Sequence, residues 1–310
     1  MGRIVVLGVF MADTTYRSDR LPRRGETITG RGFALGPGGK GSNQAVAAAL
    51  AGAEVRLISR LGRDAFAEMA REMWRRAGVL PEVTEDPDSH TGAACILVDD
   101  ATGDNAIIIT PGAAAHISAA DVESRADLIA GADVLLTQLE QPMPAALRAL
   151  QIARAAGTVT ILNPAPAAAL PAGMLALCDY VTPNESEAEG LTGIAVASPE
   201  DARRAAGRLL AEGAGAAIIT LGERGVLFHD GRRSLVVPAL AAGPVVETTG
   251  AGDAFNGGFA AALAEGMEPV AAARFGCAVA AISVTRPGAA SSMPGRDEVD
   301  RLLAAAGPLR

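Results

Sequence analysis

The chain has 310 residues, with 27 basic and 35 acidic side chains and a formal net charge of −8. This length is sufficient for one large α/β domain, or two smaller ones, with a sizeable buried core. The acidic balance excludes the long-range basic field that attracts nucleic acid or anionic lipid. An anionic substrate must therefore be bound by local groups.

Three scattered cysteines, Cys95, Cys178 and Cys277, lack the Cys-x-x-Cys spacing. They indicate reduced thiols, and the three histidines lie too far from them in sequence to favour a zinc site. The apolar run at residues 4–9 is too short for a signal peptide, and no run approaches the roughly 20 apolar residues of a membrane span. We therefore expect a cytoplasmic protein that binds neither nucleic acid nor membrane.

Strands and helices alternate along most of the chain. Clusters of β-branched residues bounded by glycine or proline predict strands at residues 3–9, 55–60, 93–98, 106–110, 133–138, 158–162, 180–182, 216–221 and 225–229. Helices are expected at residues 43–51, 64–77, 144–156, 199–212, 253–265 and 270–284. This alternation is typical of βαβ units around a mainly parallel sheet, so the expected fold class is α/β.

Two segments interrupt the alternation. Residues 11–37 are polar and rich in turns, and residues 91–110 predict two strands joined by a turn at 99–105. Together they predict a small separate sheet that would act as a hinged lid; an extension of the edge of the main sheet is the alternative. We expect one domain over residues 1–310 that carries these two lid segments.

The densest glycine cluster, at residues 36–43, runs directly into the helix expected from residue 43. Glycines allow a close approach of the backbone, and a helix N-terminus offers unpaired N–H groups, so the cluster predicts a site for an anion or a polyol. Ala34 and Gly41 stand where a Walker A loop needs its first glycine and its Ser or Thr, which excludes that motif. A connection without a ligand is the alternative.

A second cluster, Thr249-Gly250-Ala251-Gly252-Asp253, follows a strand-like run at 244–246 and opens a helix. Successive N–H groups at a helix start can hold charge on a transferred phosphoryl group. Asp253, in the first helical turn, could accept a proton from a hydroxyl, or could serve only as a helix cap.

Two further motifs lie between these clusters. Asn184 and Glu187 are three residues apart, which suits a hydrated Mg²⁺ beside phosphates, although acidic helix starts are also common. The run at residues 220–225 follows a strand and predicts a tight turn, with contact to a nucleotide as the alternative.

Taken in chain order, these clusters resemble the ribokinase (PfkB-type) family of carbohydrate kinases from residue 5 to about residue 301, and segments 181–189 and 284–289 resemble its ribokinase branch. The resemblance implies a ribokinase-like three-layer α/β/α fold, with a mainly parallel central sheet and a small β lid. It implies transfer of phosphate from ATP to a sugar hydroxyl, with ribose or a related pentose as the expected substrate, and a homodimer formed through the lid.

The resemblance also implies roles for individual residues. The catalytic set would be the base Asp253 with Gly250, Ala251 and Gly252. The sugar would be bound by Met11, Asp13, Gly39, Lys40, Gly41, Ser42, Asn43 and Glu140. The nucleotide would be bound by Asn184, Thr220, Leu221, Gly222, Glu223, Arg224, Gly225 and Cys277. Mg²⁺ would be arranged by Glu187, and a monovalent cation, usually K⁺, by Glu247, Thr249, Ser283, Arg286, Gly288 and Ser292.

Three residues depart from the ribokinase pattern: Glu247 replaces the usual Asp, Met11 the usual Asn, and Cys277 a frequent His or Asn. Met11 removes an amide that would bind the sugar, so the substrate need not be ribose; the alternative is that Met11 only packs under the lid and ribose is held through Asp13. A nucleoside kinase of the same fold is a further hypothesis. A non-catalytic sugar or nucleotide sensor is another, which the intact Asp253 opposes.

Overall fold

The computed structural model describes residues 1–309; Arg310, the last residue of the expected domain, lies outside the described residues. Thirteen strands form two sheets. The main sheet contains β1 (Arg3–Leu7), β4 (Glu54–Leu61), β5 (Leu80–Glu85), β8 (Val134–Thr137), β9 (Val159–Leu162), β10 (Tyr180–Val181), β11 (Ala216–Thr220), β12 (Val226–His229) and β13 (Ser234–Val237). The second sheet, here named the lid sheet, contains β2 (Met11–Ser18), β3 (Gly32–Gly38), β6 (Ala93–Asp99) and β7 (Asn105–Thr110).

Helices cover both faces of the main sheet. They are α1 (Lys40–Leu50), α2 (Ala65–Ala77), α3 (Ala119–Glu123), α4 (Ala126–Ala130), α5 (Met143–Ala156), α6 (Glu185–Thr192), α7 (Pro199–Ala211), α8 (Ala251–Ala264), α9 (Pro269–Ser283) and α10 (Arg296–Ala306). Short 3₁₀ turns are η1 (Gly112–His116), η2 (Leu175–Leu177), η3 (Gly222–Arg224) and η4 (Ala290–Ser292). Over residues 1–309, no helix combines the length and apolar character that crossing a bilayer requires.

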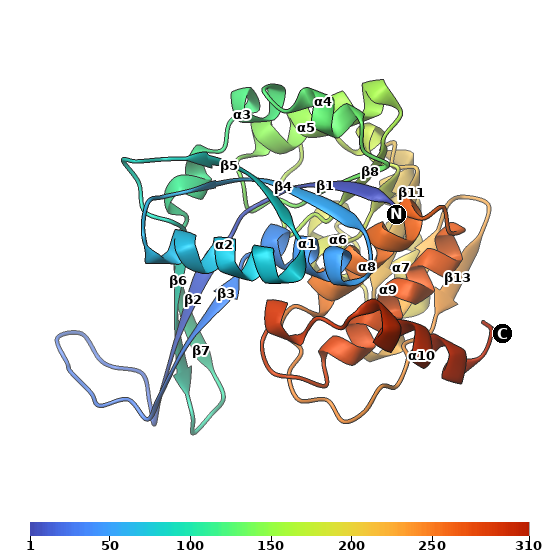
Figure 1. Ribbon diagram of the computed structural model, residues 1–310. Coiled ribbons are helices and arrows are strands. Elements are labelled where there is room, and N and C mark those ends of the chain that lie inside the picture. Colours follow the sequence, from blue (N-terminus) through green and yellow to red (C-terminus); the bar gives the residue numbers. More distant parts are fainter. Residues whose placement is uncertain (310) are drawn as a thin grey trace.

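The main sheet has the order β13-β12-β11-β10-β9-β8-β1-β4-β5, and only β12 and β13 run antiparallel to their neighbours. Its central strands are buried on both faces, which explains their continuous apolar runs. One apolar cluster joins the sheet to α1, α2, α8 and α9, and another joins it to α5, α6 and α7. Figure 1 shows α3, α4 and α5 on one side of β1 and β4, with α1 and α2 on the other. The expected three-layer α/β/α fold is confirmed.

The lid sheet is separate from the main sheet. Its order is β3-β2-β6-β7, with β2 antiparallel to β3 and parallel to β6, so the alternative of an edge extension is wrong. It projects from the lower left of the domain in Figure 1. Met11 and Asp13 are two residues apart on β2 and therefore point to the same face of the lid sheet.

A carboxylate joins the base of the lid sheet to the main domain. Asp64 caps α2 by accepting from the N–H of Ala67, and its other oxygen accepts from the N–H of Thr91 at 2.7 Å. Thr91, one residue before Gly92, also accepts from the N–H of Gly62 at 3.0 Å. The segment leading into β6 is thereby held against the start of α2.

Several expected boundaries differ from those observed. The strand expected at 244–246 is wrong: Val245 and Val246 are 65% and 61% exposed and pair with no strand. Helix α1 begins at Lys40, because Gly39 adopts φ 88° and lets the chain turn into the helix inside the glycine cluster. Strands β5 and β13 and helices α3, α4 and α10 were not predicted, since their short or polar sequences lack a clear apolar period.

Candidate active site

The carboxylate of Asp253 lies at the centre of the site, in the first turn of α8 and only 7% exposed. Its Oδ2 accepts from Asn43 Nδ2 at 2.9 Å, and its Oδ1 accepts from Gln44 Nε2 at 2.9 Å. Burial raises the pKa of Asp253, while the charge of Lys40 and these two hydrogen bonds lower it. The two glycine clusters, 210 residues apart, therefore meet at one carboxylate.

The N-terminus of α8 presents unpaired donors beside that carboxylate. Gly250 caps the helix with φ 77°, and a Cβ there would lie 2.9 Å from the Cβ of Ala289. The N–H of Ala254 donates to the carbonyl of Gly250, but among residues 1–309 the N–H groups of Gly252 and Asp253 have no acceptor. Two free donors at the positive end of a 14-residue helix form a site for an anion.

Two further carboxyl groups flank Lys40. Glu140 Oε2 accepts from the backbone N–H of Lys40 at 2.8 Å, and burial raises the pKa of Glu140 to about 7. Burial also raises the pKa of Asp13, on the lid sheet, to about 6. The positive charge of Lys40 lowers the pKa values of Glu140, Asp253 and Glu187, so this one lysine acts on three carboxyl groups.

The glycine cluster around α1 serves both packing and binding. Asn43 Oδ1 is buried without a partner among the described residues, which suits a hydroxyl donor from a ligand. A Cβ at Gly41 would lie 2.5 Å from the Cα of Gly8, so a glycine is needed where α1 crosses the end of β1. Ser42 is fully buried and accepts from the indole of Trp74 at 2.8 Å, so its hydroxyl is bonded to a side chain of α2.

Asn184 and Glu187 form a capping box at the start of α6. Asn184 Oδ1 accepts from the N–H of Glu187 at 2.8 Å, and Glu187 Oε2 accepts from the N–H of Asn184 at 2.9 Å. Burial raises the pKa of Glu187, the hydrogen bond from the N–H of Asn184 and the charge of Lys40 lower it, and the charge of Asp253 raises it. Glu187 therefore has a structural role and also lies within the field of the site.

The expected nucleotide segment, residues 220–225, is a tight turn beside α6. Thr220 forms a β-bridge with Asn184, and Arg224 pairs with Glu185 at 2.9 Å. Gly222–Arg224 form the turn η3, between a buried Leu221 and a glycine that approaches the backbone of Val237. Cys277 lies in the core on α9, which packs against α8, and burial raises the pKa of its thiol to about 12.

The residues expected around a monovalent cation lie on two adjoining loops. Glu247 Oε2 accepts from the N–H of Gly288 at 2.9 Å, which ties the two loops together. The hydroxyls of Ser283 and Ser292 donate to the carbonyls of Ala280 and Ala289, in each case three residues earlier in the same turn. Arg286 is paired with Glu298 at the start of α10, and Thr249 is exposed next to Gly250.

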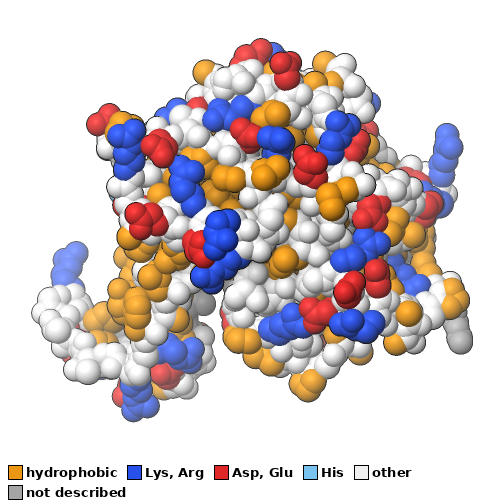
Figure 2. Space-filling view, viewed as in Figure 1, with side chains coloured by type: hydrophobic (Ala, Val, Ile, Leu, Met, Phe, Trp, Pro, Cys, Tyr) orange, Lys and Arg blue, Asp and Glu red, His pale blue; other side chains and the backbone are white. Residues whose placement is uncertain are grey.

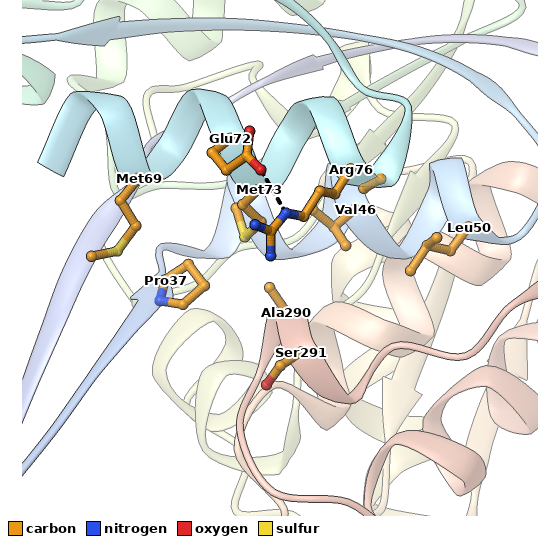
Figure 3. Close-up of a pocket in the computed structure, with 10 residues that line it drawn as sticks. Pro37, Val46, Leu50, Met69, Glu72, Met73, Arg76, Ala290 and Ser291 are labelled. Atoms are coloured by element: carbon orange, nitrogen blue, oxygen red, sulfur yellow. Dashed lines mark hydrogen bonds and ion pairs between the residues drawn. The ribbon is translucent and has the colours of Figure 1, made fainter.

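A separate groove of about 410 Å³ lies between α1, α2 and η4 (Figure 3). Met69, Met73 and Leu50 make it apolar, and the Glu72–Arg76 pair, with Nε to Oε1 at 2.7 Å, closes its rim. It contains none of the carboxylates described above. This groove is therefore distinct from the site at Asp253.

Comparison with known proteins agrees with this geometry. The sequence model of the pfkB family carbohydrate kinases matches residues 1–296. The chain belongs to this family. It is 40% identical over 301 residues to a ribokinase of Haemophilus influenzae, covering 97% of this chain and 98% of that protein. It is 34% identical over 302 residues to a deoxyribokinase of Salmonella typhi, covering 97% and 98%. Among solved structures, that of Arabidopsis thaliana ribokinase complexed with ribose and ATP has a TM-score of 0.91 and 31% identity, covering 97% of this chain and 99% of that one.

Four buried amide side chains of this carbohydrate kinase were not identified from the sequence as candidate site residues. Gln44, Gln138, Asn163 and Asn256 connect Asp253 to the ends of β8, β9 and β10. A signal was available, since Gln138 and Asn163 directly follow buried parallel strands, where ligand sites form. No local sequence pattern distinguishes these four amide residues from other Asn and Gln residues.

Proposed function

We propose that this protein transfers the γ-phosphoryl group of ATP to a hydroxyl of ribose or a closely related pentose, with Asp253 as the general base. One observation carries the proposal: a buried carboxylate, oriented by two amides, lies beside the unpaired N–H groups that open α8. Hydroxyl activation and stabilisation of phosphoryl charge are the two tasks of such a transfer. The ribose named for several relatives supports the substrate class.

The residues of the site have different chemical roles in the proposed transfer. Bound ATP with Mg²⁺ supplies the phosphoryl group and part of the charge neutralisation. Asp253 takes the proton of the sugar hydroxyl, and the N–H groups of Gly252 and Asp253 face the charge of the transferred group. Asp13, Glu140 and Asn43 Oδ1 accept hydrogen bonds from the other hydroxyls.

The remaining cofactor assignments follow from the same site. Glu187 would hold hydrated Mg²⁺ through the carboxylate oxygen that the capping box leaves free. The loops joined by Glu247 and Gly288 would hold K⁺ mainly through backbone carbonyls. Residues 220–225, beside α6, would line the nucleotide pocket.

A 2-deoxypentose is a second candidate substrate. Met11 is 6% exposed, lies on the same face of the lid sheet as Asp13, and packs its sulfur over Gly92. It presents thioether and methylene groups where an amide would bind a hydroxyl, so a sugar lacking one hydroxyl loses little here. One relative of this chain is a deoxyribokinase.

We further propose a cytoplasmic homodimer formed through the lid sheet. Tyr16 and Phe33 pack at 5.2 Å between ring centroids while remaining 44% and 62% exposed, and Ile108 is 64% exposed. Figure 2 shows hydrophobic side chains gathered over this sheet. A second copy would cover both this patch and the free edge of β7. Cys95, Cys178 and Cys277 are all free thiols, as in a reducing compartment.

Steady-state ADP release from ribose, 2-deoxyribose, fructose and nucleosides, with Mg²⁺ and K⁺, tests the function. Asp253→Asn should lower kcat by at least about 10³-fold while the Kd for ATP changes little, because only the base is lost. Glu189→Gln, on an exposed face of α6, is the matched control and should retain full activity. Retained turnover in Asp253→Asn would refute the base, and tight sugar binding without turnover in the unaltered protein would indicate a sensor.

A further inference from the structure

Gln44 differs from its neighbour Asn43, although both donate to Asp253. Asn43 keeps an unpartnered oxygen, as a group that meets a ligand would. Gln44 is fully buried and uses its whole amide within the protein: Nε2 donates to Asp253 Oδ1 at 2.9 Å and to Asn163 Oδ1 at 3.1 Å. Its Oε1 accepts from Gln138 Nε2 at 2.5 Å. Both N–H groups and the oxygen of this amide have partners within the protein, and the side chain is fully buried, so its role is internal.

The partners of Gln44 fix its orientation. A flip of the amide would turn its oxygen toward the carboxylate of Asp253 and the carbonyl oxygen of Asn163. Each of these contacts is repulsive in a buried environment. The donor toward Asp253 Oδ1 is therefore present before any substrate arrives.

A chain of hydrogen bonds continues from Asn163 back to α8. Asn163 Nδ2 donates to the carbonyl of Thr182 at 3.0 Å, and Thr182 Oγ1 donates to Asn256 Oδ1 at 2.6 Å. Asn256 Nδ2 donates to the carbonyl of Gly252 at 2.8 Å. The network thus returns to the residue before Asp253 and links the carboxylate to the loop that presents the free N–H groups.

We propose that Gln44, locked by Gln138 and Asn163, is a positioning residue for the general base: it holds Asp253 so that Oδ2 faces the sugar hydroxyl. The carboxylate is buried and its two oxygens have different partners, so rotation about its side chain is restrained by the Gln44 bond on one side. This inference rests on the proposed function. It concerns the geometry and protonation of the base, whereas Asn43 and Glu140 contact the sugar.

The test compares the pH dependence of kcat for Gln44→Met and Gln44→Glu. Methionine has a similar length but donates nothing, so kcat should fall at least about tenfold while the KM for the sugar stays within about threefold. The acidic limb of the kcat profile should move to higher pH, because the ionised form of Asp253 loses a donor. Glutamate should move it further, since a second carboxyl group repels the first.

Thr158→Val is the matched control for lost stability. Thr158 is 4% exposed and donates to the carbonyl of Ile129 at 3.0 Å, near the start of β9 and at the end opposite Asn163. It should lower the unfolding temperature without moving the acidic limb. If Gln44→Met does not fold, Gln138→Met removes the outer lock and should shift the limb in the same direction by a smaller amount.

The outcomes separate the two proposals. An unaltered enzyme that releases no ADP with any sugar overturns the proposed function. An active enzyme whose Gln44 variants keep the acidic limb in place, with loss of stability alone as in Thr158→Val, overturns the positioning role of Gln44. A shift in the order unaltered, methionine, glutamate supports it.

Discussion

Replacing Glu140 with glutamine should stabilise the free protein at pH 8 while weakening its binding of the sugar. Glu140 is mostly buried, its Oε2 accepts from the N–H of Lys40, and Asp253 and Asp13 add negative charge nearby. An ionised carboxylate at this position is therefore costly, although it is well suited to accept hydrogen bonds from a sugar. Glutamine keeps an acceptor for Lys40 and removes the charge.

The magnitude follows from the pKa. For Glu140 it is about 7 in the folded protein, against 4.5 for an unperturbed glutamate. Because the folded-state value is the higher one, the folded protein binds this proton more tightly, and the free energy of unfolding falls as pH rises from 4.5 to 7. The full loss, above pH 7, is about 3 kcal/mol. With an unfolding entropy of roughly 0.65 kcal/mol/K for a chain of this length, Glu140→Gln should raise Tm by about 5 °C at pH 8.

Thermal unfolding without ligands at pH 5 and pH 8 measures this effect. Near pH 5 the carboxyl group is mostly protonated in the folded protein, so the stabilisation should largely disappear. Glu189→Gln, which removes an exposed carboxylate, should leave Tm unchanged at both values. An equal Tm change at pH 5 and pH 8 would refute the argument from ionisation. Calorimetric titration should show a sugar Kd at least about tenfold weaker in Glu140→Gln at pH 8.

Three further predictions concern the lid sheet. Met11→Asn should raise the ratio of kcat/KM for ribose over 2-deoxyribose about tenfold or more, because it supplies an amide for the additional hydroxyl; an unchanged ratio would mean that residue 11 only packs under the lid. Asp64→Ala removes the acceptor for the N–H groups of Ala67 and Thr91, and should lower the free energy of unfolding by about 1–2 kcal/mol and speed amide exchange at Thr91, which mass spectrometry would detect. Ile108→Lys should convert a dimer to a monomer in analytical ultracentrifugation; an unaltered mass would place the interface elsewhere.

The parts of the fold that were predicted have local causes. Strands buried on both faces are continuous apolar runs, so β1, β8 and β11 were recognisable from local clusters of β-branched and other apolar residues. The strand expected at 244–246 failed because two adjacent valines resemble a strand although no neighbouring strand pairs with them. The β-branched residues are visible in the sequence at this point, but the sequence does not show whether a neighbouring strand is available to pair with them.

The candidate site also has parts with local causes, which were predicted, and parts that depend on the fold, which were not. The two glycine-rich helix starts were predicted, because Gly39 and Gly250 meet a local requirement for positive φ. The hydrogen bonds that orient Asp253 were not visible, since Gln44 and Gln138 are 94 residues apart and only the fold brings them together. Glu187 was expected to be a metal ligand from its spacing to Asn184, yet the same spacing produces a capping box, and both roles draw on one carboxylate.

The electrostatics of the site explain how an acidic protein could bind ATP. Burial raises the pKa of Glu140 to about 7, so this group carries only part of a negative charge near neutral pH, and burial also raises the pKa values of Asp13 and Asp253. Lys40 and the free N–H groups at the start of α8 supply positive potential at short range. Phosphates approaching that helix would meet donors first, whereas sugar hydroxyls would meet carboxylates and Asn43. The division into a donor-rich end and an acceptor-rich end orients the two substrates with the carboxylate of Asp253 between them.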